Sequence, residues 1–191
     1  MPAYSRRLDD ALALAADAFR DHERKASGVP YLTHLLSVCA LVGEHGGDED
    51  QMIAALLHDY LEDVDGEAGP MLTARFGPRV AQIVGALSDT LETPKPPWQA
   101  RKDAYLALLR DEPAEIKLVS AADKLHNCRS VIRDHHAVGD AVFDRFTAGK
   151  VGTLWYYRAV TAALAVGWAH PILVELHEAV SDLHRLAETP I

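Results

Sequence analysis

Apolar residues recur along this chain at intervals of three or four, and this periodicity constrains the fold more than any other feature of the sequence. Such spacing places the apolar side chains on one face of an α-helix. Runs in which apolar and polar residues alternate, with enrichment in β-branched residues, are missing, so no strand is predicted. The sequence therefore predicts an all-α protein, built as a compact bundle of helices.

Glycines and capping residues indicate where the first helices begin and end. The first two apolar stripes precede Gly46-Gly47 and consist of Leu8, Leu12, Ala15 and Phe19, then of Leu35, Val38, Leu41 and Val42. Asp48 is the expected N-cap of a third helix, because Gln51 three residues later completes a capping-box pattern. This third helix should carry Leu57 and Leu61 and end near Asp63.

The second half of the chain has the same helical character. A short element is expected to end at Phe76-Gly77-Pro78, and longer helices are expected at about 78–91, 99–110, 113–133, 150–166 and 171–187. The stretch 92–98 contains TPKPPW and must be a loop, because proline lacks the amide donor and fixes its own φ.

Size and composition narrow the class of protein. The 191 residues, 49% of them hydrophobic, suit one soluble globular domain that covers residues 1–191. No apolar run approaches the length of a membrane span, and no signal peptide is recognisable. Cys39 and Cys128 form no CxxC motif, which favours buried thiols and a cytoplasmic location. The net charge of −9 argues against nucleic acid as a partner but leaves a small phosphorylated ligand possible. The oligomeric state stays open.

Metal-ligand side chains occupy positions where a helix should bury apolar surface. His34 shares a stripe with apolar residues four and seven positions later, His58-Asp59 directly follows an apolar run, and Asp123 follows apolar residues by four and seven positions. An ionised Asp on a buried face is costly unless it is paired or bound to a cation. Each residue alone has an ordinary explanation in a core or an ion pair. Together they predict one divalent cation, and the mixed nitrogen and oxygen donors favour Mn, Fe, Co or Zn over calcium.

Two further carboxylates lie close to this set. Glu62 is four residues after His58, and Asp63 is four after Asp59, so a continuous helix would place all of them on one face. Acidic residues are disfavoured at a helix C-terminus by the macrodipole, although a solvated helix end remains the competing explanation. We interpret Glu62 and Asp63 as candidates for orienting or deprotonating a water molecule beside the metal.

The order H…HD…D on successive helices resembles the signature of HD-domain phosphohydrolases. The segments ERKASGVPYLTH (23–34), LLHDYLEDV (56–64), RFGPRVAQIVGALSD (75–89) and AADKLHNCRS (121–130) resemble, in the same order, the hydrolase domain of RelA/SpoT-type proteins. This resemblance covers most of residues 8–165. It is greatest to the small stand-alone hydrolases that have no synthetase domain.

The resemblance implies a Mn²⁺-dependent 3′-pyrophosphohydrolase that acts on (p)ppGpp. The residues that match the family's metal ligands are His34, His58, Asp59 and Asp123, and those that match the groups serving the attacking water are Glu62 and Asp63. Asn127 matches a residue that helps to position the substrate phosphate. Arg24 and Lys25 match a pair that borders the nucleobase pocket.

The sequence also departs from the family and leaves alternatives open. Ser120 and Ala121 stand where a typical member has Lys-Leu, which removes one positive charge near the cleft. The sequence does not decide whether Tyr156, Tyr157, Arg158 or Lys95 lines the pocket; His170, His177 and His184 are interpreted as structural or exposed. A nucleoside monophosphate or NADPH is the alternative substrate, and a non-catalytic nucleotide sensor or a purely structural helical domain is the alternative role.

Overall fold

The computed structural model describes residues 4–25, 27–63, 68–88, 90 and 94–188, except for the side chain of Asp63. The elements in chain order are α1 (Arg6–Ala18), α2 (Leu32–Glu44), α3 (Glu49–Leu57), α4 (Tyr60–Asp63), α5 (Ala68–Phe76), α6 (Pro78–Leu87), α7 (Trp98–Asp111), α8 (Ala114–Val138), the 3₁₀-helix η1 (Gly139–Arg145), α9 (Gly149–Leu164) and α10 (Pro171–Glu188). In these ranges the pairing of β type is one isolated bridge between Glu23 and Pro30. The all-α fold predicted from the periodicity is confirmed.

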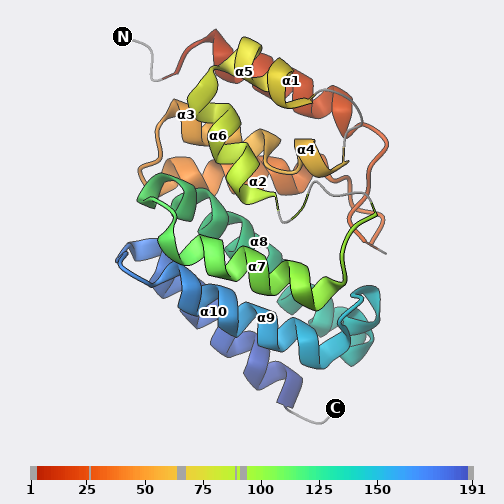
Figure 1. The fold of residues 1–191 in the computed structure, drawn as a ribbon. Coiled ribbons are helices and arrows are strands. Elements are labelled where there is room, and N and C mark those ends of the chain that lie inside the picture. The colour runs from red at the N-terminus through yellow and green to blue at the C-terminus, as the bar shows by residue number, and fades with distance from the viewer. Residues whose placement is uncertain (1–3, 26, 64–67, 89, 91–93, 189–191) are drawn as a thin grey trace.

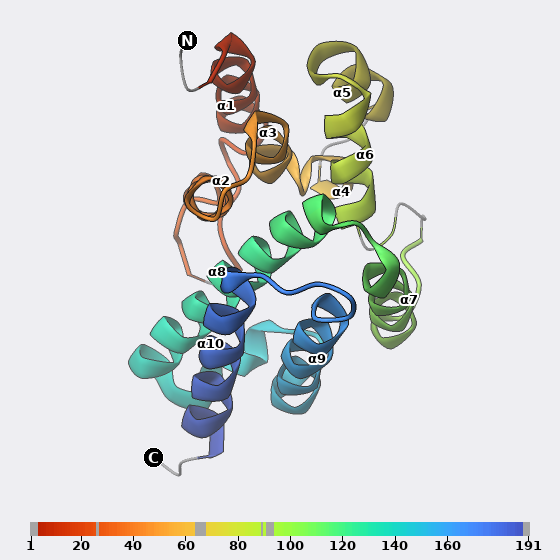
Figure 2. The same cartoon turned by 90° about the vertical axis from the view of Figure 1, so that its left-hand side faces the viewer.

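Helix α8 runs through the middle of the molecule and joins its two halves (Figures 1 and 2). It packs against α2, α3 and α6 on one side and against α9, α10 and η1 on the other. Helices α1 to α6 form the first half, and α7, α9 and α10 lie across α8 from them. A residue on α8 can therefore face side chains from both halves, which is how the fold brings distant parts of the sequence to one site.

Local sequence explains most helix boundaries. Asp48 accepts a hydrogen bond from the Gln51 amide and the Gln51 side chain accepts one from the Asp48 amide, which is the capping box predicted for α3. Pro78 stands at the first position of α6, where its missing amide costs nothing. Helix α6 ends at Leu87 rather than near residue 91, and η1 at 139–145 was not predicted.

The third predicted helix is interrupted in the structure. Helix α3 ends at Leu57, His58 and Asp59 form a turn, and α4 starts at Tyr60. His58 Nδ1 lies 2.8 Å from the carbonyl oxygen of Ala55, an acceptor that an unbroken helix would use for its own backbone. The prediction of one continuous helix was wrong at this point because the side chain of His58 competes with the backbone.

Burial follows most of the predicted stripes, although Leu8 and Leu41 are only partly buried. Ala15, Phe19, Leu35 and Val38 are fully or almost fully buried, whereas Leu12 is 41% exposed. Ala11 is fully buried instead, so the buried face of α1 lies one residue away from the predicted stripe at this position. Among the described residues, no helix has both the length and the hydropathy of a membrane span.

Candidate metal centre and adjoining cavity

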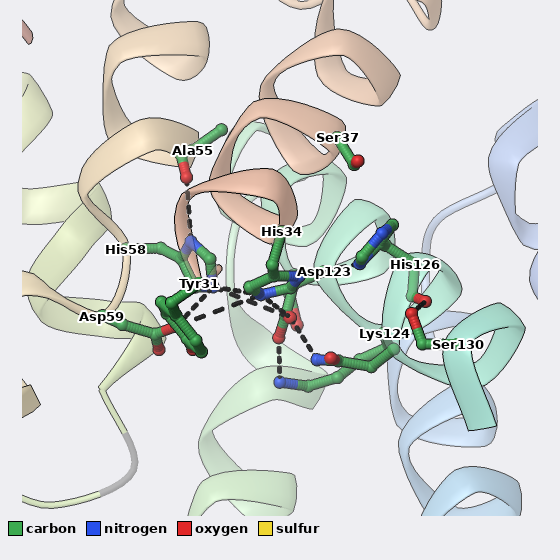
Figure 3. A network of polar contacts seen from close by, with 12 residues as sticks. Tyr31, His34, Ser37, Ala55, His58, Asp59, Asp123, Lys124, His126 and Ser130 are labelled. Carbon is green, nitrogen blue, oxygen red and sulfur yellow. Dashed lines mark hydrogen bonds and ion pairs between the residues drawn. The ribbon is translucent and has the colours of Figure 1, made fainter. Parts of the chain in front are cut away.

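Side chains from three separate parts of the chain meet beside α8. His34 comes from α2, His58 and Asp59 from the turn after α3, and Asp123 from α8 (Figure 3). His34 Nε2 lies 3.3 Å from His58 Nε2 and 3.2 Å from Asp123 Oδ1, and His58 Nε2 lies 3.0 Å from Asp59 Oδ2. The structure thus brings together all four residues predicted as metal ligands.

The spacing of these atoms suits a single cation. Ligands about 2.1 Å from one ion are about 3.0 to 3.4 Å apart at octahedral or tetrahedral angles. The three distances above fall in or at the edge of this range, and His58 Nε2 to Asp123 Oδ1 is 3.6 Å. One ligand atom each from His34, His58 and Asp59 lies within 4.8 Å of the others. Two imidazoles and two carboxylates are a donor set that binds a divalent transition metal.

The ionisable groups of this cluster shift one another's pKa values. Burial raises the pKa of Asp59, but the neighbouring His58 outweighs it and brings this pKa down to about 2. Burial lowers the pKa of His58, yet the carboxylates of Asp59 and Asp123 together raise it well above its ordinary value. Burial lowers the pKa of His34. Both carboxylates are therefore ionised at neutral pH, as ligands of a cation must be.

Each carboxylate is held by further polar groups. Tyr31 donates its hydroxyl hydrogen to Asp59, and Lys124 and Asn127 both donate to Asp123. Lys124 has the largest charge effect among the groups that lower the pKa of Asp123, although burial acts in the opposite direction. These contacts hold both carboxylates next to the two imidazoles. Tyr31 was not predicted as a site residue; it lies three residues before His34, a spacing that is a weak signal on its own.

The two predicted catalytic carboxylates have different outcomes. Glu62 lines a cavity of about 260 Å³ together with His58, Asp59 and Asp123. Its carboxylate also lies 3.5 Å from Lys95 Nζ, which shows that the proline-rich loop approaches the site. The side chain of Asp63 lies outside the described residues.

A second cavity of about 300 Å³ adjoins the first and extends from it toward α9. The residues that line both cavities are Lys25, Tyr31, Lys102, Lys124, Asn127 and Tyr156. Arg24 lines the second cavity, and its guanidinium donates to Asn127 Oδ1 over 2.7 Å. The three residues predicted to contact substrate therefore lie together at one cavity next to the metal ligands.

The structure shows which of the residues that the sequence left undecided line a cavity near the metal ligands. Tyr156 and Tyr157 line the second cavity, whereas Arg158 is 64% exposed and lines a groove between α9 and α10. The predicted structural role of His184 fits its contact with the Leu154 carbonyl, 3.1 Å away. His177 is exposed and lines the same groove as Arg158. None of these histidines lines the two cavities described above.

The family departure at position 120 has a structural counterpart. Ser120 is fully buried, and its Oγ lies 2.9 Å from the hydroxyl of Tyr105. The Tyr105 ring lies 5.5 Å from Lys124 Nζ and forms part of the wall of the smaller cavity. The hydrogen-bonded pair of Tyr105 and Ser120 thus lies next to Lys124. The periodic apolar pattern did not indicate Tyr105 as a site residue.

Comparison with known proteins agrees with this geometry. The chain is 32% identical over 130 residues to guanosine-3′,5′-bis(diphosphate) 3′-pyrophosphohydrolase of Aquifex aeolicus, over 68% of this chain and 18% of that protein. It is 33% identical over 190 residues to GTP pyrophosphokinase rsh of Brucella melitensis, over 95% of this chain and 24% of that protein. The chain therefore spans less than a quarter of the length of these curated relatives.

Solved structures share the fold. A metazoan SpoT orthologue, described as hydrolysing ppGpp, superposes with a TM-score of 0.78 at 24% identity and covers 95% of this chain and 97% of its own. A Listeria monocytogenes protein superposes with a TM-score of 0.70 at 28% identity, over 78% of this chain and 96% of its own. The family model described as "HD domain" matches residues 11–154, which contain all four predicted metal ligands. This protein belongs to the HD domain family.

Proposed function

We propose that this protein is a metal-dependent phosphohydrolase, and specifically a 3′-pyrophosphohydrolase that hydrolyses (p)ppGpp to pyrophosphate and GDP or GTP. The observation that carries this proposal is the convergence of His34, His58, Asp59 and Asp123 at the end of a cavity bordered by cationic side chains. We further propose that residues 1–191 form a single HD-type hydrolase domain.

The four converging side chains would hold one divalent cation, and we propose Mn²⁺, with Fe, Co and Zn as alternatives. Such a cation polarises a phosphoryl oxygen and lowers the pKa of water, so that a nucleophile is available near neutral pH. His34 and His58 offer neutral nitrogen donors, and Asp59 and Asp123 supply the negative charge that neutralises the ion. Tyr31 and Lys124 keep the two carboxylates in place.

Glu62 and Asp63 are proposed to orient and deprotonate the attacking water. Glu62 lines the same small cavity as Asp59 and Asp123. A water molecule in this cavity can therefore contact the Glu62 carboxylate as well as the proposed metal ligands. In the reaction, one water molecule is consumed and the bond between the 3′ oxygen and its phosphorus breaks. The 3′ oxygen takes up a proton, and pyrophosphate leaves.

The cations around the cavities suit the products of this cleavage. Lys102 and Lys124 line both cavities and can face the phosphates of a substrate whose 3′ phosphorus lies at the metal ligands. Arg24 and Lys25 border the second cavity at the loop after α1, where we propose that they contact the nucleobase. Asn127 accepts a hydrogen bond from Arg24 and donates one to Asp123. We propose that it positions a substrate phosphate between these two residues.

The relatives' names support the choice of substrate. Relatives in Aquifex aeolicus and Escherichia coli O157:H7 are both named guanosine-3′,5′-bis(diphosphate) 3′-pyrophosphohydrolase, and each is 32% identical to this chain over about two thirds of its length. The match covers only 18% of either relative. The HD domain that the family model matches, residues 11–154, contains the four candidate ligands.

The test is turnover of ppGpp by purified protein loaded with Mn²⁺, with Asp59→Ala as the control. We expect the wild type to release pyrophosphate and GDP in equimolar amounts and the variant to release neither. If metal-loaded wild-type protein does not cleave ppGpp, this nucleotide is excluded as the substrate. A panel of nucleoside monophosphates and NADPH then decides between another hydrolase and a nucleotide sensor without catalysis.

A further inference from the structure

The two imidazoles of the metal centre are oriented in different ways. His58 Nδ1 lies 2.8 Å from the backbone carbonyl of Ala55, which has no hydrogen and can only accept. His34 Nδ1 instead lies 2.8 Å from Nδ1 of another side chain, His126 (Figure 3). His58 is thus held by a group that no substitution removes, whereas His34 depends on a replaceable side chain.

We propose that His126 is a positioning residue that orients His34 for cation binding. The proposal rests on the metal site described above but not on the identity of the substrate. A histidine that offers the lone pair of Nε2 to a cation carries its proton on Nδ1, and this proton needs an acceptor. His34 Nε2 faces His58 and Asp123, and its Nδ1, which would carry the proton, faces His126.

The geometry identifies an in-plane hydrogen bond rather than ring stacking. The rings of His34 and His126 have their centroids 4.9 Å apart and are tilted by 38°, while the two Nδ1 atoms are at ordinary hydrogen-bond distance. Two nitrogens at this distance cannot both carry a proton. With the proton on His34, His126 accepts through Nδ1 and carries its own proton on Nε2.

Helix α8 links this contact to the rest of the site. Asp123 and His126 lie three residues apart on α8, which places them on neighbouring positions of one helix face. The same rigid helix therefore supplies one ligand and the group that orients a ligand on α2. A change in the relative placement of α2 and α8 would disturb both at once, so His126 ties the two helices together at the metal.

Three substitutions separate this role from simple packing. In His126→Asn, the amide oxygen can take the place of Nδ1 and still accept from His34; in His126→Gln, the amide lies one carbon further out, near the former Nε2. In His126→Leu no acceptor remains. Loss of an acceptor for the second nitrogen of a ligand histidine typically weakens metal binding 10–100-fold.

The measurement is Mn²⁺ affinity by competition with a chelator, read from the free Mn²⁺ signal in electron paramagnetic resonance. We expect His126→Leu and His126→Gln to bind Mn²⁺ about 10–100-fold more weakly than wild type and His126→Asn to stay within about threefold. The melting temperatures of the metal-free variants should agree with one another. Affinity within threefold of wild type for His126→Leu, or an Asn variant as weak as the Gln variant, would overturn the proposal.

These measurements distinguish loss of the role of His126 from misfolding, from absence of a metal site and from a different substrate. If His126→Leu does not fold, the Asn and Gln variants decide alone, because both keep a polar side chain of similar size. Wild-type protein without measurable Mn²⁺ affinity would contradict the metal site itself. Wild-type protein that binds Mn²⁺ but does not cleave ppGpp would contradict only the proposed substrate and leave the role of His126 standing.

Discussion

Lys117 is a buried side chain that ties α7 and α9, two helices that line the second cavity, to α8. It is 3% exposed, and its ammonium group donates to the carbonyl oxygens of Arg110 and Val166 over 2.8 and 2.7 Å. Arg110 lies in the last turn of α7, and Val166 follows the end of α9. The C-terminal ends of both helices carry unpaired carbonyls with partial negative charge, so the ammonium stabilises them electrostatically as well as by hydrogen bonding.

Replacement of Lys117 by Met should destabilise the fold without removing any group of the site. Each charge-assisted hydrogen bond contributes about 1.5–3 kcal/mol. Met fills the space of the stem and avoids the burial of a charge, and Val166 is 37% exposed, so water can reach its carbonyl. These offsets leave a net loss of about 2–3 kcal/mol, or about 4–12 °C in melting temperature for a chain of this size.

Thermal unfolding followed by circular dichroism measures this loss. Arg20→Met is the matched control, because Arg20 forms an ion pair with Asp17 in which both side chains are more than 60% exposed (67% and 80%). Such a surface pair contributes at most about 1 kcal/mol. A Lys117→Met protein that melts within 2 °C of the Arg20→Met control would refute the assignment of Lys117 as a structural link.

Other predictions concern the metal centre. Asp123→Ala should lose both bound Mn²⁺ and turnover while keeping its helical circular dichroism; a variant that retains metal and activity contradicts the proposed site. Glu62→Gln should keep its metal, measured by elemental analysis, and lose about 10²–10⁴-fold in kcat, since it removes the proposed general base; unchanged turnover would return Glu62 to a structural role. Burial lowers the pKa of His58, but Asp59 and Asp123 outweigh it and raise this pKa well above its ordinary value, so a cation that binds Nε2 competes with a proton there. Mn²⁺ affinity should therefore rise with pH, with about one proton released per ion; calorimetry in buffers of different ionisation enthalpy checks this, and identical enthalpies would rule it out.

The fold was predictable because its helices carry their own boundary signals. The capping box at Asp48 and Gln51 and Pro78 at the start of α6 are local features, so the sequence alone locates them. The break at His58 was not predictable in this way. It depends on a side chain that bonds the Ala55 carbonyl in the folded protein, and periodicity does not report on such competition.

The residues of the site also fall into two groups, those that the sequence indicates and those that only the folded structure reveals. The metal-ligand residue types on buried faces were visible because a polar group there contradicts the apolar pattern. Tyr105 and His126 were not visible, because a tyrosine on an apolar face satisfies the pattern and His126 lies beside a motif that already explains its neighbourhood. What they do depends on packing of α7 and α2 against α8, which only the tertiary structure supplies.

The charge distribution of this acidic chain is compatible with the proposed anionic substrate. The net charge is −9, yet the second cavity is bordered by a set of cations: Arg24, Lys25, Lys102, Lys124 and Arg145. These residues come from the loop after α1, from α7, from α8 and from η1, so they meet only when the chain folds. One carboxylate, Asp134, also lines this cavity and lies 2.7 Å from Arg145, so the lining has five cations against one carboxylate, an excess opposite in sign to the net charge of the chain.

This arrangement selects for anions that are small. At an ionic strength of about 0.15 M, charges interact over about 8 Å, so a nucleotide inside the cavity senses the cations around it and little of the acidic surface beyond. A longer polyanion must lie along that surface and is repelled. We therefore expect a single-stranded oligonucleotide, added at tenfold excess of phosphate over ppGpp, to leave turnover unchanged, while inorganic pyrophosphate at the same phosphate concentration inhibits. Equal inhibition by both would mean that the cations attract phosphate regardless of its context, and the cavity would then have no part in excluding nucleic acid.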